Sequence, residues 1–258
     1  MKLTFLGTGT SFGVPVVGCD CPACTSDDPR DRRTRHGALV ETGEGTLLVD
    51  TPPELRLQLI DAGVSTVDAV WFTHVHADHI HGIDDLRVFT VRHGDMPAYV
   101  PEEYVDAMQA HFRYIFDDRF RPPQGSSKPR IRIEGFEPDD TVRVVGRDFT
   151  PVPVPHGGVT VYGFRVGSLG YVTDAKTLTP EAVRRLEGVE TLVLNALWFG
   201  RTHGSHFNIE EAIEASREVG ARRTFLTHLT HRVTHAEVAE RVVDGVLPAH
   251  DGLSVEID

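Results

Sequence analysis

The sequence has few of the features that mark membrane or secreted proteins. No segment approaches the about 20 consecutive apolar residues that a transmembrane helix needs. The first residues include no long apolar region and no small-residue cleavage site, so we expect a first strand there and no signal peptide. The only cysteines are Cys19, Cys21 and Cys24, an odd and clustered set that makes a poor disulfide framework. We therefore expect a protein of the cytoplasm that has no contact with membranes.

Positive charge is also scarce. Lysine and arginine number 26 against 38 aspartates and glutamates, which gives a formal net charge of −12. Such a chain has no general electrostatic attraction to nucleic acid or to anionic membranes, so we do not expect nucleic acid as a partner. An anionic small-molecule substrate would need a local positive site, which bound metal ions can provide.

Short apolar strands alternate with amphipathic helices along the chain. This pattern predicts an α/β (α+β) fold in four layers, with two mixed β-sheets flanked by helices, over a single domain of residues 1–258. Residues 7–37 form a long segment with little strand pattern, and such loops are usually functional or disordered. The expected strands are Lys2–Leu6, Ala38–Glu41, Thr46–Val49, Ala69–Phe72, Ile131–Ile133, Val142–Val145, Thr150–Val154, Thr160–Val166, Tyr171–Thr173 and Thr191–Leu194. The expected helices are Glu54–Ile60, Glu102–Phe116, Glu181–Leu186, Ile209–Val219 and Ala236–Val243.

A cluster of polar residues directly follows the apolar strand that ends at Phe72. It contains His74, His76, Asp78 and His79. Neutral imidazole and carboxylate are the ligands that zinc and manganese favour, and a loop at a strand end commonly carries chemistry. Four such groups in six positions cannot all face a hydrophobic core. A metal site is therefore favoured over a polar surface turn.

The spacing His-x-His-x-Asp-His resembles the signature of the metallo-β-lactamase superfamily, and His156, Asp174 and His228 stand at later strand ends. The resemblance implies a metallo-β-lactamase αββα sandwich with two catalytic divalent ions. Two ions about 3.5 to 4 Å apart can share a water, lower its pKa and present a bridging hydroxide at neutral pH. Manganese or zinc fits these ligands, and iron or nickel also suits them. The implied ligands are His74, His76 and His156 for one ion, Asp78, His79 and His228 for the other, and Asp174 as the bridge.

The three cysteines supply three thiolates within the 7–37 segment. Structural zinc is almost always four-coordinate, and three cysteines with one histidine form a common set. Our choice for the fourth ligand is His231, which lies three residues after His228. The alternative is a group of reduced cysteines without a metal. A zinc ion on Cys19, Cys21, Cys24 and His231 would hold the N-terminal loop against the loop that carries a catalytic ligand.

The Cys-x-Cys-x-x-Cys loop together with the later His-x-x-His resembles the PhnP-type phosphoribosyl cyclic phosphodiesterase family. In that family these four positions bind a structural zinc. The resemblance implies hydrolysis of a small cyclic phosphodiester, with 5-phosphoribosyl 1,2-cyclic phosphate as the natural substrate, and a homodimer. It also places His206 in the active site, where it would contact the substrate phosphate and protonate the leaving alkoxide. Asp78 is the second residue that we expect to be catalytic.

Three further features have two interpretations each. His206 could instead be a helix-start histidine with local hydrogen bonds, which is the favoured role for His203. Asp50 either orients a histidine ligand or caps the helix that follows Pro52 and Pro53. Residues 113–132 are locally basic and could attract phosphate, although a solvated surface loop is the favoured interpretation.

Other hydrolases and a non-catalytic protein remain as alternatives. A tRNA 3′-processing endonuclease uses the same ligands but usually needs an extended basic arm, which is not visible in the sequence. A lactonase, thioesterase or β-lactamase would share the metals but not the cysteine loop. A PqqB-like protein of cofactor biosynthesis also carries such a loop, but the complete ligand set favours catalysis.

Overall fold

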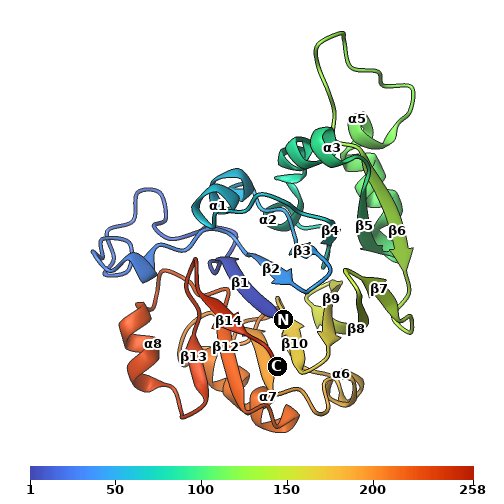
Figure 1. Ribbon diagram of the computed structural model, residues 1–258. Coiled ribbons are helices and arrows are strands. Elements are labelled where there is room, and N and C mark those ends of the chain that lie inside the picture. Colours follow the sequence, from blue (N-terminus) through green and yellow to red (C-terminus); the bar gives the residue numbers. More distant parts are fainter.

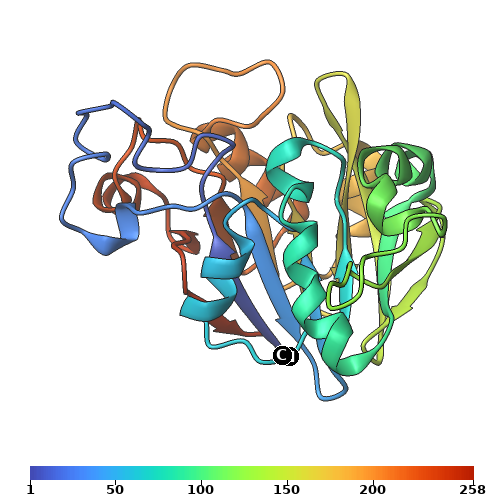
Figure 2. The same cartoon turned by 90° about the horizontal axis from the view of Figure 1, so that it is seen from above.

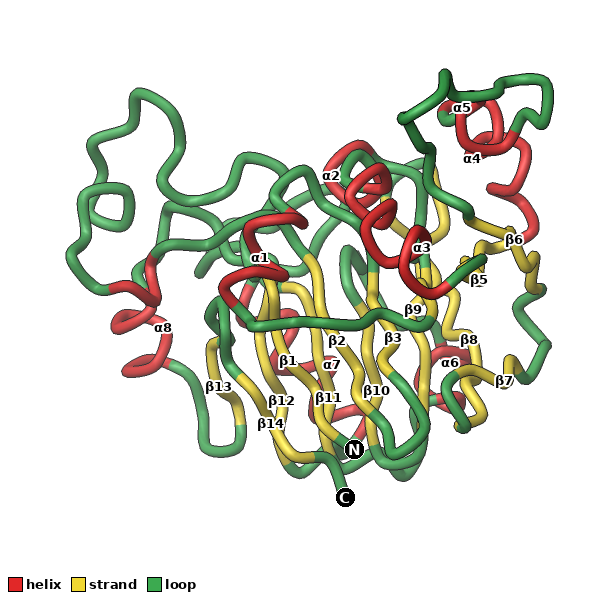
Figure 3. The backbone as a smooth tube through the Cα atoms, turned by 45° about the horizontal axis from the view of Figure 1, so that its top comes forward, coloured by secondary structure: helices red, strands yellow, loops and turns green.

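Two mixed seven-stranded β-sheets form the centre of the structure, a computed structural model that describes residues 1–258. They pack face to face, as Figures 1 and 3 show. In the order of hydrogen-bonded neighbours, the first sheet contains β14 (Ser254–Glu256), β1 (Lys2–Gly7), β2 (Gly37–Glu41), β3 (Thr46–Val49), β4 (Ala69–Trp71), β5 (Met96–Pro101) and β6 (Ile131–Phe136). The second contains β13 (Val246–Pro248), β12 (Arg223–Thr227), β11 (Thr191–Asn195), β10 (Leu169–Val172), β9 (Val159–Val166), β8 (Arg147–His156) and β7 (Val142–Val144).

Helices cover the outer faces of both sheets, which confirms the expected αββα layering (Figure 2). No helix is both long and apolar enough to cross a membrane. The helices against the first sheet are α1 (Leu55–Asp61), α2 (Ala77–Ile80), α3 (Arg87–His93), α4 (Val105–His111) and α5 (Arg113–Phe116), with the 3-10 turns η2 (Ile83–Leu86) and η3 (Glu102–Tyr104). Those on the side of the second sheet are α6 (Pro180–Arg185), α7 (Ile209–Val219) and α8 (His235–Arg241), and η1 (Pro29–Asp31) lies in the N-terminal loop.

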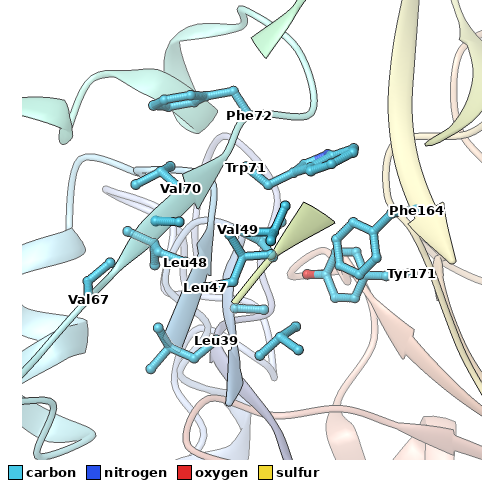
Figure 4. Close-up of a cluster of buried hydrophobic side chains, with 14 of the residues drawn as sticks. Leu39, Leu47, Leu48, Val49, Val67, Val70, Trp71, Phe72, Phe164 and Tyr171 are labelled. Atoms are coloured by element: carbon cyan, nitrogen blue, oxygen red, sulfur yellow. The ribbon is translucent and has the colours of Figure 1, made fainter. Parts of the chain in front are cut away.

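The core between the sheets is aromatic around β4 (Figure 4). Trp71 is fully buried, and its ring centroid lies 4.4 Å from that of Phe136 and 5.5 Å from that of Phe164 on β9. Its indole Nε1 donates a hydrogen bond of 3.0 Å to the carbonyl oxygen of Tyr162, which satisfies the only polar group of the ring. These contacts fix the end of β4 against the second sheet. The loop that begins at Phe72 therefore starts from a rigid point.

Strands that run parallel bring their carboxyl ends to one edge of each sheet. β3 is parallel to β4, and β10, β11 and β12 are parallel to one another. The loops that leave this edge carry the residues singled out in the sequence. The two termini lie together at the opposite edge (Figure 3), where the Met1 ammonium donates to the carbonyl oxygen of Ile257.

The strands and helices that the sequence predicts are present, with one exception. The predicted helix Glu102–Phe116 is divided into η3, α4 and α5, because the backbone at Phe112 (φ −116°, ψ 46°) leaves the helical region while its side chain enters the core. The structure also contains elements that the sequence analysis did not predict, namely β5, β13, β14, α2 and α3. In β5, Pro97 and Pro101 obscure the strand pattern. The 7–37 segment is a loop, as expected, with only η1 and isolated bridges.

Candidate metal centre

The histidine motif lies between β4 and α2. His74 and His79 are fully buried, whereas His76 is exposed and Asp78 is partly exposed. α2 begins at Ala77, so a single helical turn places Asp78 and His79 next to each other at its start. The Oδ2 atom of Asp78 and the Nε2 atom of His79 are 3.5 Å apart. The tight loop thus gathers four potential ligands on one side of the strand end.

The other predicted ligands stand directly after strands. His156 is the last residue of β8, His228 follows β12, and Asp174 lies two residues beyond β10. Asp174 and His228 have positive φ angles of 55° and 60°. Non-glycine residues in this left-handed region are uncommon and gather at functional sites, where the surrounding structure holds the strain.

Asp174 is the residue on which the site converges. Its Oδ2 atom lies 3.2 Å from Nε2 of His79 and 3.8 Å from Nε2 of His74. Its Oδ1 atom lies 3.2 Å from Nδ1 of His228. The Nε2 atoms of His156 and His206 lie 3.9 Å and 3.8 Å from Oδ2. One buried carboxylate therefore faces five imidazole rings.

The ligand groups agree in part with the expected division into two ions. The potential ligand atoms of His74, His76 and His156 all lie within 4.8 Å of one another, as expected for one ion. The second expected set, Asp78, His79 and His228, does not form such a group by itself. His79 and His228 meet at Asp174, and Asp78 lies beside His79. Two further groups include Asp174: one with His74 and His79, and one with His156 and His206.

Buried nitrogen atoms without partners show that the residues fit a cation. Nε2 of His79 and Nδ1 of His228 are buried and have no hydrogen-bond partner. A buried polar atom without a partner is costly, and both of these atoms face Asp174. Burial lowers the pKa of His228 to about 4 against the opposing effect of Asp174, so its ring is neutral and offers a lone pair.

Three carboxylates around His79 stabilise a positive charge at this position. Burial alone would lower the pKa of His79, but Asp174, Asp50 and Asp78 together raise it well above its usual value. Burial would likewise raise the pKa of Asp174, but His228 and His79 lower it well below the usual range. A divalent cation would meet the same demand for positive charge.

Asp50 contacts His79, as one of its two interpretations predicted. Its Oδ2 atom accepts a hydrogen bond of 2.6 Å from Nδ1 of His79, and its Oδ1 atom accepts one of 2.8 Å from the Thr73 amide. The helix-cap interpretation is wrong, because the N-cap of α1 is Glu54. Asp50 therefore turns Nε2 of His79 toward Asp174.

Thr73 in turn orients the ring of His74. Its hydroxyl donates to Asp50 at 2.9 Å, so it accepts a hydrogen bond of 3.0 Å from Nδ1 of His74. This leaves Nε2 of His74 with a lone pair that faces the centre. His156 is oriented in the same manner, because its Nδ1 donates to the carbonyl oxygen of Ser205 at 2.9 Å.

A second group lies in the N-terminal loop, where His231 meets the three cysteines. The Sγ atoms of Cys19 and Cys21 lie 3.3 Å and 3.4 Å from Nδ1 of His231, and Cys24 completes a group within 4.8 Å. Burial alone would raise the pKa of the Cys21 thiol, but hydrogen bonds from the Cys24 amide and from His231 lower it to about 6. Three sulfur atoms and one imidazole form a donor set that suits four-coordinate zinc.

A buried arginine joins the two groups. Arg33 is fully buried and donates hydrogen bonds of 2.7 Å and 3.0 Å to the carbonyl oxygens of Thr230 and Val233. It also forms a buried ion pair of 2.9 Å with Asp31. The loop that follows β12 is thus held against the N-terminal loop by Arg33 as well as by the cysteine group.

The structure also places residues that the sequence left without a role. His36 is fully buried, with its ring centroid 5.5 Å from that of His79 and its Nε2 atom 2.8 Å from the Tyr171 hydroxyl. Nothing in its sequence context indicated this position. His203 contacts Ser205 and His206 locally, as favoured, and its ring packs against Trp198.

The basic segment is largely neutralised by neighbouring carboxylates. Arg113 and Arg119 pair with Asp117, and the remaining pairs join Arg130 to Asp95 and Arg132 to Glu134. These pairs agree with the favoured interpretation of a solvated surface loop.

Comparisons with known proteins agree with this geometry. Residues 45–229 match the family model of the β-lactamase superfamily domain. The chain is 34% identical to an octanoyltransferase of Porphyromonas gingivalis over its full length, but it spans about half of that relative (52%). It is 27% identical to a ribonuclease Z of Methanopyrus kandleri, over 100% of this chain and 98% of that protein.

Two solved structures share the fold. A crystal structure described as a new diphosphatase from the PhnP family has a TM-score of 0.90 and 34% identity, and the match covers 100% of this chain and 98% of that one. Zinc-bound PqqB from Methylobacterium extorquens has a TM-score of 0.83 at 19% identity, with full coverage of both chains. The second likeness shows the fold alone.

Proposed function

Because this chain belongs to the β-lactamase superfamily and has the metallo-β-lactamase fold, we propose that it is a dinuclear metal-dependent hydrolase of small phosphodiesters. The observation that carries the proposal is the convergence of His74, His79, His156, His206 and His228 on the buried carboxylate of Asp174.

The metal ligands in this proposal are those that the family resemblance implies. His74, His76 and His156 would hold one ion, Asp78, His79 and His228 would hold the other, and Asp174 would contribute to both. Divalent ions at such a site supply Lewis acidity and a water of lowered pKa at neutral pH. Manganese and zinc are the proposed metals, and zinc is also proposed for Cys19, Cys21, Cys24 and His231.

His206 is the proposed general acid. The Ser205 hydroxyl lies 3.0 Å from Nδ1 of His206 and can donate to it, which favours a proton on Nε2. That Nε2 atom is buried, has no partner and lies beside Asp174. It can therefore hold a proton until the leaving oxygen of the ester takes it up. Asp78 is only partly buried and can accept the proton of the attacking water.

The substrate class is supported by the PhnP-family likeness at 34% identity. We propose a small cyclic phosphodiester, with 5-phosphoribosyl 1,2-cyclic phosphate as the first compound to test. A tRNA 3′-processing activity is the alternative that the ribonuclease Z match supports, but the net charge of −12 disfavours binding of a polyanion. A PqqB-like protein without hydrolytic activity is the third candidate.

Turnover assays distinguish the three candidates. The protein is loaded with manganese or zinc and assayed on bis(p-nitrophenyl) phosphate, 5-phosphoribosyl 1,2-cyclic phosphate and a tRNA precursor. We expect turnover of the two small diesters and its loss in Asp174→Ala, whereas Asp117→Ala, a change in the distant surface loop, retains it. Cleavage of only the tRNA precursor would support the endonuclease. No turnover with any divalent metal would refute the proposal.

We also propose a homodimer in the cytoplasm, because the resembled PhnP-type family forms dimers and the cysteines form no disulfide framework. Light scattering on the purified chain measures its mass in solution. A particle of the 28.5 kDa monomer at micromolar concentration would refute the dimer.

A further inference from the structure

A cavity of about 300 Å³ opens beside one half of the metal centre. It contains His206 and His228, whereas His74, His76 and His156 do not line it. The cavity is lined by residues of the N-terminal loop and of the loops that follow β11 and β12. Figure 2 shows these loops in blue, orange and red. A group held there would be a part of the substrate beyond the bond that is cleaved. The lining of the cavity also includes Ser11, Phe12, Trp198 and Arg232.

Arg232 is the only lysine or arginine that lines this cavity, and no aspartate or glutamate lines it. Its guanidinium carbon lies 4.4 Å from the ring centroid of Trp198, within the range of a cation–π interaction. The guanidinium has no carboxylate within ion-pair distance and makes no hydrogen bond to the protein; only the backbone amide donates, to the Thr230 hydroxyl. Its N–H donors are therefore free to bind a ligand.

Trp198 is itself held in place. Its Nε1 atom donates a hydrogen bond of 2.7 Å to the carbonyl oxygen of Arg201, and the His203 ring packs edge-on at a centroid distance of 5.8 Å. The indole is thus a fixed platform that limits the freedom of the guanidinium. A donor group that is ordered before binding loses less entropy when the ligand arrives.

Arg241 offers a contrast on the neighbouring surface. It also stacks on an aromatic ring, with its guanidinium carbon 3.6 Å from the centroid of Phe199. Unlike Arg232, it forms an ion pair with Glu237, and it does not line the cavity. Stacking alone is thus found elsewhere on this surface, and the lack of a carboxylate partner distinguishes Arg232.

We propose that Arg232, held on Trp198, binds a second phosphate group of the substrate while the scissile phosphate lies at the metal centre. The planar guanidinium matches phosphate oxygens in a two-point contact, and these charge-assisted hydrogen bonds are among the strongest in proteins. In a chain of net charge −12, such a cation would offset the repulsion of a polyanionic ligand. The inference rests on the proposed function and adds the residue that would hold a second phosphate group of the substrate.

Phe12 also lines this cavity. Its side chain is 74% exposed, which is unusual for a phenylalanine beside a catalytic centre. An aromatic surface there would cover the sugar or other carbon skeleton that joins the two phosphates. Phe12 belongs to the same loop as the cysteine group, so the proposed zinc would also fix this surface.

Competition with nucleotides that differ in phosphate number tests the proposal. Inhibition of bis(p-nitrophenyl) phosphate hydrolysis is measured with adenosine 5′-monophosphate, adenosine 5′-diphosphate and adenosine 3′,5′-bisphosphate. In the wild type we expect the better of the two-phosphate compounds to bind at least about tenfold more tightly than the monophosphate. Arg232→Ala should remove this advantage, Arg232→Lys should keep a minor part of it, and Arg241→Ala should keep all of it.

Two results would overturn the proposal: equal affinity for all three nucleotides in the wild type, or an unchanged advantage in Arg232→Ala. Calorimetric titration of the metal-loaded protein with the same nucleotides separates this inference from the proposed function, because it needs no turnover. If the wild type hydrolyses no phosphodiester, the proposed function fails, and the titration still decides the role of Arg232. If Arg232→Ala does not fold, Arg232→Lys, which keeps the charge without the planar fork, decides the question.

Discussion

The buried ion pair between Arg33 and Asp31 provides a sharp test of how the N-terminal loop is held. Oδ1 of Asp31 lies 2.9 Å from the Arg33 guanidinium and also accepts a hydrogen bond of 2.6 Å from the amide of His235. The side chains of the pair are 0% and 3% exposed. The change Asp31→Ala would leave the buried guanidinium without its counter-charge and the His235 amide without its acceptor.

Removing one partner of a buried ion pair costs about 3 to 5 kcal/mol. In a chain of this size each kcal/mol lowers the melting temperature by about 2 to 4 °C. We therefore expect Asp31→Ala to melt roughly 6 to 20 °C below the wild type. The zinc content should also fall, because Arg33 positions the Thr230 carbonyl beside His231.

The matched control is Asp28→Ala, three residues earlier in the same loop. Asp28 pairs with Arg30, whose side chain is 49% exposed, so solvent screens the interaction. Asp28 also accepts a hydrogen bond from the Arg30 amide as the N-cap of η1, so we expect a loss of stability that is smaller than that of Asp31→Ala. Differential scanning calorimetry and metal analysis of the two variants give the comparison. If Asp31→Ala and Asp28→Ala melt at the same temperature, the buried pair does not hold the loop and the reasoning is refuted.

Three further substitutions test the two metal groups. Cys21→Ser should lose about one zinc per chain and lower the melting temperature, and unchanged metal content would contradict the cysteine site. His206→Ala should reduce kcat by roughly 10²- to 10⁴-fold with metal content intact, whereas near-normal turnover would exclude it as the general acid. Asp50→Asn should weaken metal binding or activity by roughly 10- to 100-fold, because His79 loses the carboxylate that orients it. Titration of the metal-free variant with manganese measures this loss of affinity. A variant that binds manganese as tightly as the wild type would show that Asp50 has no such role.

The sequence predicted the fold and the grouping of the polar residues where local patterns carry the information. A polar motif that directly follows an apolar strand lies in the loop at the end of that strand. Parallel strands place their carboxyl ends, and therefore these loops, at the same edge of a sheet. This is why His74, Asp174 and His228, far apart in the chain, meet as expected. The choice of His231 depended on its distance of three residues from His228, and the structure places it beside Cys19 and Cys21.

Contacts between distant loops could not be predicted in the same manner. The stacking of Arg232 on Trp198 and the burial of Arg33 depend on how two irregular loops pack. Such packing has no periodic pattern in the sequence. The burial of His36 beneath His79 is similar, because a lone histidine before a strand has no distinguishing pattern. Aspartate is enriched among non-glycine residues with a left-handed backbone, but most aspartates do not adopt it, so the residue type alone could not predict this conformation at Asp174.

The metal content of the purified chain tests the proposed dinuclear centre most directly. Protein loaded with manganese and zinc, freed of unbound ions and analysed by plasma mass spectrometry, should contain three metal ions per chain. Asp174→Ala should retain about one, the zinc held by the cysteine group, because the carboxylate shared by both catalytic ions is gone. A wild-type chain that holds no more than one ion, or an Asp174→Ala variant that still holds three, would contradict the account.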